Sequence, residues 1–282
     1  MIPPALGPLG VGEPVLLRIA TWNVNSVKAR IVNLLHWLAQ AQPDVVMLQE
    51  IKVSTADFPR LEIEDLGYNV AVVGQKTYNG VALLSKHPMT VEETRLPGDE
   101  SDEQARYIEA LIEATATKGG KRTVLRAVSV YVPNGNPVES DKFPYKLTWL
   151  DRLHERMAEI LTFEEIAVIG GDYNVIPTDD DVYDPVAWRA DALGRPESRA
   201  KFRKLLHLGY TDALRALHPE PHLYTFWDYQ AGHWPRDEGL RIDHLLLSPQ
   251  AADRLHASGV DREPRGRDKP SDHTPVWCEL DA

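Results

Sequence analysis

Seven polar residues suited to metal-assisted phosphate chemistry each lie at the end of a short apolar run of this chain. Such positions are where α/β proteins gather their sites, because polar side chains at the ends of neighbouring strands converge. Asparagine and aspartate also favour plain turns, whereas glutamate does not, so Glu50 after Val-Val-Met-Leu-Gln stands out. The seven are Asn23, Glu50, Tyr131, Asp172, Asn174, Asp272 and His273.

The carboxylates and the histidine predict the hydrolysis of a phosphate ester. Glu50 and Asp272 offer the hard oxygen ligands that magnesium prefers. Asp172 could orient or deprotonate a water molecule. Asp243 could hold the imidazole of His273 in one tautomer.

The remaining polar residues suit the phosphate itself. Asn23, Asn174 and Tyr131 could donate to phosphate oxygens whose charge builds up in the transition state. No Walker loop, Rossmann glycine motif, zinc-type Cys/His spacing or Gly-x-Ser-x-Gly turn competes with this interpretation. The single cysteine, Cys278, allows no intrachain disulfide and is expected in the core.

Composition sets limits on the class of protein. With 282 residues, 43% hydrophobic and 26% charged, the chain is close to an average globular protein, which excludes a disordered or collagen-like chain. No run approaches the roughly 18 apolar residues of a membrane span. The net charge of −11 argues against coating nucleic acid by bulk charge, but an enzyme needs only a local basic face. Basic residues cluster in three stretches that also fit ordinary solvated faces: 118–126, 195–204 and 262–269.

The apolar pattern predicts interspersed strands and helices over most of the length. Helical spacing marks residues 26–41, 143–161 and 197–208. The strand pairs within 68–84 and 107–132 leave no room for helical crossovers, which argues against a plain parallel βαβ fold. Strands are predicted at 15–24, 45–48, 68–73, 81–84, 107–114, 124–132, 166–169, 223–229, 242–247 and 274–280.

The N-terminal segment differs in composition from the rest. Residues 1–14 contain four prolines and three glycines and lack the features of a secretory signal, so we expect a flexible tail there. No linker or short repeat divides residues 15–282, which we expect to form one domain. The acidic run at 179–181 is expected to be a solvated turn, not a second metal site.

Eight segments, in order from about residue 17 to 280, resemble the exonuclease III family of abasic-site endonucleases within the endonuclease–exonuclease–phosphatase superfamily. Gln-Glu alone, or Ser-Asp-His alone, marks only the superfamily. Gln-Glu-Ile-Lys from residue 49, Leu-Arg-Ile-Asp from 240 and Lys-Pro-Ser-Asp-His from 269 are much more specific to the abasic-site branch. The other matching segments are 21–25, 80–85, 131–135, 171–174 and 226–229.

The resemblance implies a DNase I-like α/β fold, a four-layered sandwich in which two mixed β-sheets pack face to face between flanking helices. It implies that Glu50 is the principal metal ligand, with other residues near the metal: Asn23, Asn25 and Asp272. Asn25 stands where some relatives carry aspartate. The residues implied around the scissile phosphate and the attacking water are Tyr131, Asn134, Asp172 and Asn174, with His273, oriented by Asp243, polarising the phosphate.

The resemblance also implies a specificity pocket. Phe226, Leu240 and Ile242 fall where the family lines a slot for a flipped, baseless sugar, which an intact nucleotide would not fit. The alternative is that they are core strand residues. Residues 230–235 fall where relatives place a loop against DNA, and which side chain enters the helix stays open.

The predicted activity is magnesium-dependent hydrolysis, with manganese as a substitute, of the phosphodiester bond 5′ to an abasic site in double-stranded DNA. We also expect 3′–5′ exonuclease and 3′-end-cleaning activity, in a cytoplasmic monomer of bacterial type. One rival is a phosphatase or phospholipase-like hydrolase of the same superfamily that acts on non-DNA phosphoesters. A second rival is a catalytically silent DNA-binding protein.

Overall fold

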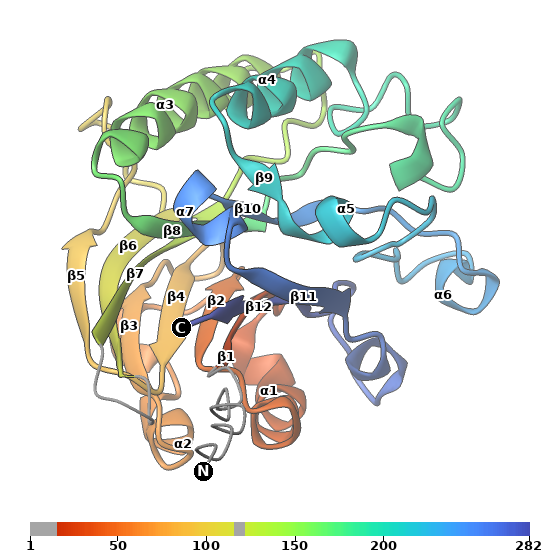
Figure 1. The fold of residues 1–282 in the computed structure, drawn as a ribbon. Helices are drawn as coiled ribbons and strands as arrows, with labels where there is room; N and C mark the ends of the chain where they lie inside the picture. Colours follow the sequence, from red (N-terminus) through yellow and green to blue (C-terminus); the bar gives the residue numbers. More distant parts are fainter. Residues whose placement is uncertain (1–15, 116–121) are drawn as a thin grey trace, which may run out of the picture.

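Two mixed β-sheets form the centre of the protein in the computed structural model, which describes residues 16–115 and 122–282 (Figure 1). Within these residues each sheet has six strands. The first sheet has the order β11 (Leu255–Val260), β12 (Val276–Asp281), β1 (Leu16–Asn23), β2 (Val45–Gln49), β4 (Val81–Ser85) and β3 (Asn69–Val73). The second has the order β5 (Met89–Glu93), β6 (Tyr107–Thr115), β7 (Arg122–Tyr131), β8 (Ile166–Asp172), β10 (Asp243–Leu247) and β9 (Thr211–Asp212).

Helices cover the outer face of each sheet (Figure 1). Trp37 and Leu38 of the first long helix pack against the first sheet, and Trp149 and Leu150 pack against the second together with Phe202. The α-helices are α1 (Val27–Ala41), α2 (Arg60–Glu64), α3 (Lys142–Thr162), α4 (Pro196–His207), α5 (Ala213–Leu217), α6 (His233–Arg236) and α7 (Pro249–Ala252). Short 3₁₀ turns are η1 (Thr55–Asp57), η2 (Asp179–Asp181) and η3 (Glu263–Gly266).

A third apolar cluster fills the space between the sheets. Met47 and Leu83 of the first sheet meet Ala127, Val168 and Leu245 of the second there. β2 and β4 are buried at every position, which explains why they read as continuous apolar runs and not as alternating ones. Helix, sheet, sheet and helix are therefore the four layers, and the predicted sandwich is confirmed.

Each sheet contains one parallel pair, and these pairs set where polar residues emerge. β1 pairs in parallel with β2 so that Asn23 lies opposite Gln49. β7 pairs in parallel with β8 so that Tyr131 lies opposite Asp172. In each parallel pair the two strands therefore end opposite one another, and polar residues lie side by side at their carboxyl ends.

The strand predicted over residues 223–229 is wrong. Phe226 forms only isolated bridges, to Leu240 on one side and to His273 on the other. It lies between these two segments, and its neighbours in sequence do not extend the pairing with either segment into a ladder. Strands β5, β9 and β11 were not predicted; β9 has two residues, and β5 is largely exposed, so neither shows a strong apolar pattern. The predicted tail at 1–14 lies outside the described residues.

The acidic run 179–181 is more than a solvated turn. Asp181 is fully buried and accepts hydrogen bonds from Arg241 and Arg215. Arg241 also donates to Asp212 at 2.6 Å. Asp181 is therefore one member of a buried ion cluster, and the prediction of a solvated turn is wrong for this residue.

Candidate active site

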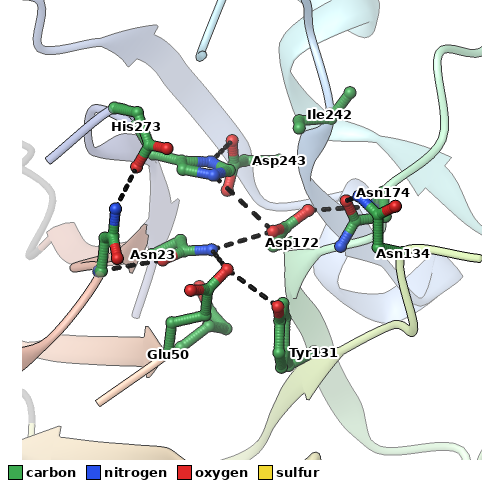
Figure 2. A network of polar contacts seen from close by, with 12 residues as sticks. Asn23, Glu50, Tyr131, Asn134, Asp172, Asn174, Ile242, Asp243 and His273 are labelled. Carbon is green, nitrogen blue, oxygen red and sulfur yellow. Dashed lines mark hydrogen bonds and ion pairs between the residues drawn. The ribbon is translucent and has the colours of Figure 1, made fainter. Parts of the chain in front are cut away.

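Residues from both sheets meet where the two parallel pairs end (Figure 2). Asn23 is the last residue of β1 and Glu50 directly follows β2; Tyr131 and Asp172 are the last residues of β7 and β8. Asn23 Nδ2 donates to Glu50 Oε1 and to Asp172 Oδ2, both at 2.9 Å. The Tyr131 hydroxyl donates to Glu50 Oε1 at 2.8 Å. The prediction that these four side chains converge is thus borne out by their contacts.

A buried polar bridge holds the two sheets together beneath this cluster. Gln49 Nε2 donates to Ser129 Oγ of β7 at 3.0 Å, and Thr21 Oγ1 donates to Gln49 Oε1 at 3.2 Å. All three side chains are fully buried. Since unpaired polar groups are costly there, this bridge fixes the relative height of the strands that carry the site. Sequence reasoning gave Gln49 no such role.

His273 lies above the carboxylates and is held from behind. Its Nδ1 is 2.9 Å from Asp243 Oδ2, and its Nε2 is 3.8 Å from Asp172 Oδ2. Thr225 Oγ1 donates to the same Asp243 oxygen at 2.7 Å. The predicted His273–Asp243 contact is present. Thr225, which the sequence did not single out, orients the Asp243 carboxylate.

The surroundings shift the pKa values of these groups in useful directions. Burial raises the pKa of Asp172, and the carboxylates of Asp243 and Glu50 add to this effect, while His273 opposes it. Burial alone would lower the pKa of His273, but Asp243 and Asp172 raise it well above its usual value. Burial and the Glu50 carboxylate raise the pKa of Tyr131, which therefore stays a hydrogen-bond donor. Such divergent shifts are typical of catalytic groups.

Glu50, Asp172 and His273 form a group that could hold a metal ion. One ligand atom from each lies within 4.8 Å of the others. Burial opposes ionisation of Glu50, but Lys52 and Asn23 keep its pKa below the usual value. Carboxylate oxygens are suitable ligands for a hard cation, so Glu50 and Asp172 fit one, whereas His273, with its raised pKa, is protonated and offers no lone pair.

The other residues predicted near the metal lie around this group. Asn23 Oδ1 accepts from the Asn25 amide, and Asn25 Oδ1 accepts from Lys52 Nζ at 2.6 Å. Asn25 Nδ2 donates to Asp272 Oδ1 at 3.0 Å. Lys52, which sequence reasoning left without a role, also contacts Glu50 Oε2 at 2.7 Å. Both asparagine oxygens therefore already have donors, and ligation by Asn23, Asn25 or Asp272 stays a prediction.

Three site residues have a left-handed backbone. The φ angles are 44° at Asn25, 49° at Glu50 and 48° at Asn174. This region is uncommon for residues other than glycine, and least so for asparagine. Its cost persists only where the surroundings fix the conformation, as they often do at functional sites.

Asn174 and Asn134 form a pair beside Asp172 (Figure 2). Asn134 Nδ2 donates to Asn174 Oδ1 at 3.1 Å, and Asn174 Nδ2 donates to Val132 O at 2.9 Å. The backbone N–H of Asn174 donates to Asp172 Oδ1 at 2.9 Å. Asn134 is exposed while Asn174 is buried, so the pair extends from the carboxylate cluster to the surface.

The three apolar residues predicted to line a sugar pocket lie together but differ in exposure. Leu240 and Ile242 are almost completely buried, in a cluster that includes Val182. Phe226 is partly exposed, and its ring lies edge-on to the His273 ring at 4.9 Å. Phe226 is thus the member of the three that can reach a substrate without rearrangement of the cluster.

Two arginines of the basic stretch 262–269 make contacts within the protein, although the stretch also fitted an ordinary solvated face. Arg265 is buried and donates to Trp227 O, and Arg262 pairs with Asp237. Both guanidinium groups also lie against Trp234 of α6, at 5.3 Å from its ring centroid. These contacts stabilise the 230–235 loop. In the 195–204 stretch, by contrast, Arg203 is exposed to solvent. Lys118 and Lys121 lie outside the described residues.

The fold and this arrangement define a hydrolase of phosphate esters, and comparisons identify the family. Residues 20–273 match the Endonuclease/Exonuclease/phosphatase family. The chain is 35% identical over 272 residues to an exodeoxyribonuclease III from Haemophilus influenzae, covering 94% of this chain and 100% of that protein. The chain therefore belongs to the Endonuclease/Exonuclease/phosphatase family and, within it, to the exonuclease III group.

Solved structures of relatives agree with this assignment. An AP endonuclease from Archaeoglobus fulgidus superposes with a TM-score of 0.87 at 36% identity, over 94% of this chain and 100% of that one. A 3′–5′ exonuclease from Neisseria meningitidis does so with the same TM-score and coverage at 38% identity. Another Neisseria structure is described as a 3′ phosphatase bound to a product DNA hairpin. None of the helices in the described ranges is long and apolar enough to cross a membrane.

Proposed function

We propose that this protein is a DNA-repair phosphodiesterase that cleaves duplex DNA 5′ to abasic sites and also removes nucleotides and blocking groups from 3′ ends. The observation that carries the proposal is the meeting of Glu50, Asp172 and His273 within 4.8 Å at the ends of both sheets. Relatives of similar length include an exodeoxyribonuclease III and an AP endonuclease. The products would be a 3′-hydroxyl and a 5′ deoxyribose phosphate.

In this proposal Mg²⁺, or Mn²⁺ in its place, would be held by Glu50, with Asn23, Asn25 and Asp272 nearby. When bound, the metal would neutralise phosphate charge and so favour attack on phosphorus. Asp172, with its raised pKa, orients the attacking water and accepts its proton. His273, protonated and held by Asp243, donates to a phosphate oxygen.

The substrate is proposed to lie across the end of the sandwich. Tyr131, Asn134 and Asn174 would surround the scissile phosphate, and Phe226, with Leu240 and Ile242 behind it, would contact the baseless sugar. The partner is double-stranded DNA with an abasic site or a 3′ end, and we propose that a monomer acts on it in the cytoplasm.

A labelled duplex with one abasic site tests the proposal, beside the intact duplex, a duplex with a recessed 3′-phosphate and an inositol phosphate. Incision 5′ to the abasic site that requires a divalent metal is expected. Hydrolysis of the inositol phosphate without DNA cleavage would favour the phosphatase rival. Tight DNA binding with no product from any substrate would favour the silent binding protein.

A further inference from the structure

Behind the pair of asparagines lies a buried lysine that contacts no carboxylate of the residues that the structure describes. Lys146 of α3 is completely inaccessible to solvent. Its Nζ donates to three backbone carbonyls: Asn174 O at 2.5 Å, Asn134 O at 3.0 Å and Ala192 O at 3.1 Å. An ammonium has three donors, and all three are used here.

These carbonyls belong to three different loops. One follows β7, one follows β8, and the third precedes α4. The first and third are also joined by Asn136 Nδ2, which lies 3.1 Å from both Asp191 carboxylate oxygens. Lys146 is thus the side chain that contacts all three carbonyls at once and ties these loops together.

The packing leaves Lys146 little freedom. A Cβ on Gly135 would lie 2.7 Å from Lys146 Cδ and 3.1 Å from the Ala192 Cβ, and Gly135 has a φ of 91°. The loop after β7 therefore packs its backbone directly on the lysine side chain. Only glycine fits at this position, because any side chain would meet both the strained φ and the lysine.

Burying the Lys146 ammonium away from water and without a carboxylate partner costs free energy. Burial lowers the pKa of Lys146 to about 7, while the more distant carboxylates of Asp172 and Asp191 oppose the shift. An apolar residue of similar length would avoid that cost. An apolar residue could not donate a hydrogen bond to Asn174 O. The left-handed backbone of Asn174 persists only where its surroundings fix it.

We propose that Lys146 is a positioning residue, which sets the side chains of Asn134 and Asn174 against the substrate phosphate by fixing their backbone carbonyls. The inference rests on the proposed function, because it assumes that these two asparagines face the phosphate. The Lys146 ammonium donates to backbone oxygen atoms and, within the described residues, to none of the reacting groups.

The test replaces Lys146 by methionine, which keeps the length of the side chain and removes its donors. The matched control is Arg156→Met, on the same helix, which breaks buried contacts to Glu109 remote from the site. We expect Lys146→Met to lower kcat on the abasic duplex by about 10–100-fold with KM changed less than about threefold. Arg156→Met should keep kcat within about twofold once corrected for the folded fraction.

A second readout needs no activity. In the free protein, the side-chain amide NMR signals of Asn134 and Asn174, assigned by their loss in Asn134→Asp and Asn174→Asp, should shift in Lys146→Met but not in Arg156→Met. If Lys146→Met does not fold, Lys146→Arg, which keeps a cation and its donors, gives the same comparison with smaller shifts expected. Unchanged amide signals together with wild-type kcat would overturn the proposal. A wild type that cleaves no DNA would contradict the proposed function instead, while the amide signals would still decide the role of Lys146.

Discussion

Asn23 joins the two sheets at the site, because its Nδ2 lies 2.9 Å from Asp172 Oδ2 across the sandwich and 2.9 Å from Glu50 Oε1 beside it. One amide group therefore separates two carboxylates that would otherwise face each other. Asn23→Ala should remove the hydrogen bond to Asp172 Oδ2 and one of the two to Glu50 Oε1, which costs roughly 1–3 kcal/mol of stability and lowers kcat.

The control for Asn23→Ala is Asn69→Ala, which removes another side-chain amide, one at the start of β3 that donates to Ser85 O and His87 O. Thermal unfolding and steady-state cleavage of the abasic duplex check the pair. Equal losses of kcat in both variants would mean that Asn23 acts on stability alone.

Glu50→Gln should weaken metal binding and reduce the rate by orders of magnitude while the fold survives, because it removes the charge that the cation would meet. Titration with Mn²⁺ followed by electron paramagnetic resonance measures the affinity directly. Glu64→Gln, at an exposed pair with Arg60, is the control. Full activity of the wild type in excess chelator would contradict the metal requirement.

Asp172→Asn and His273→Ala should each cripple turnover and leave DNA binding largely intact, because both groups act on the transition state more than on the bound substrate. Single-turnover rates and binding of an abasic duplex in chelator separate the two effects. Loss of binding with an unchanged rate per bound complex would show that the roles are wrongly assigned.

Phe226→Ala should lower cleavage at abasic sites and weaken the discrimination against intact nucleotides, because contact with the sugar and steric rejection are lost together. A purely structural Phe226 would instead cost roughly 3–5 kcal/mol with the substrate preference unchanged. The melting temperature and the ratio of abasic to intact cleavage, measured on the same preparation, distinguish these outcomes.

Asp181 should contribute to the pH dependence of stability. Burial opposes its ionisation, but Arg241 and Arg215 hold its pKa at about 2, below the usual value for an aspartate. A lowered pKa stabilises the fold above pH 4, by about 2 kcal/mol for a shift of this size, and this contribution is lost as the pH falls from about 4 to 2. Urea unfolding at several pH values should therefore show that the stability difference between wild type and Asp181→Asn shrinks over this range. A constant difference would contradict the ion pair.

The sequence was sufficient to predict the elements that bury apolar residues on a regular period, and the residues at their ends. α3 carries such a period, β2 was recognised instead as a continuous apolar run, and Glu50 follows β2 as expected. The segment 223–229 misled, since its alternating aromatic residues contact separate neighbours instead of one ladder. A pattern along the chain carries no information about which segments a residue bridges.

Local charge misled for a related reason. Asp181 sits in a run of three aspartates that suggests a solvated turn, yet its partner Arg241 is 60 positions away. Lys146 likewise lies on a helix with nothing in its neighbourhood to mark it as buried. Both roles depend on loops that close over the side chain only in the folded protein.

The central position of β1 affects when the nuclease can first exist. β1 pairs with β2 on one side and with β12 on the other, so about 250 residues of sequence separate it from its second neighbour. A ribosome synthesises the chain at roughly 5–20 residues per second and domains begin to fold as they emerge, but β1 remains an edge strand until residues 276–281 have left the ribosome. Asp272 and His273 arrive just before those residues. A chain that has not yet reached residue 272 therefore lacks both the strand that closes its first sheet and two of the site residues, so we expect activity only after residues 272–281 have left the ribosome.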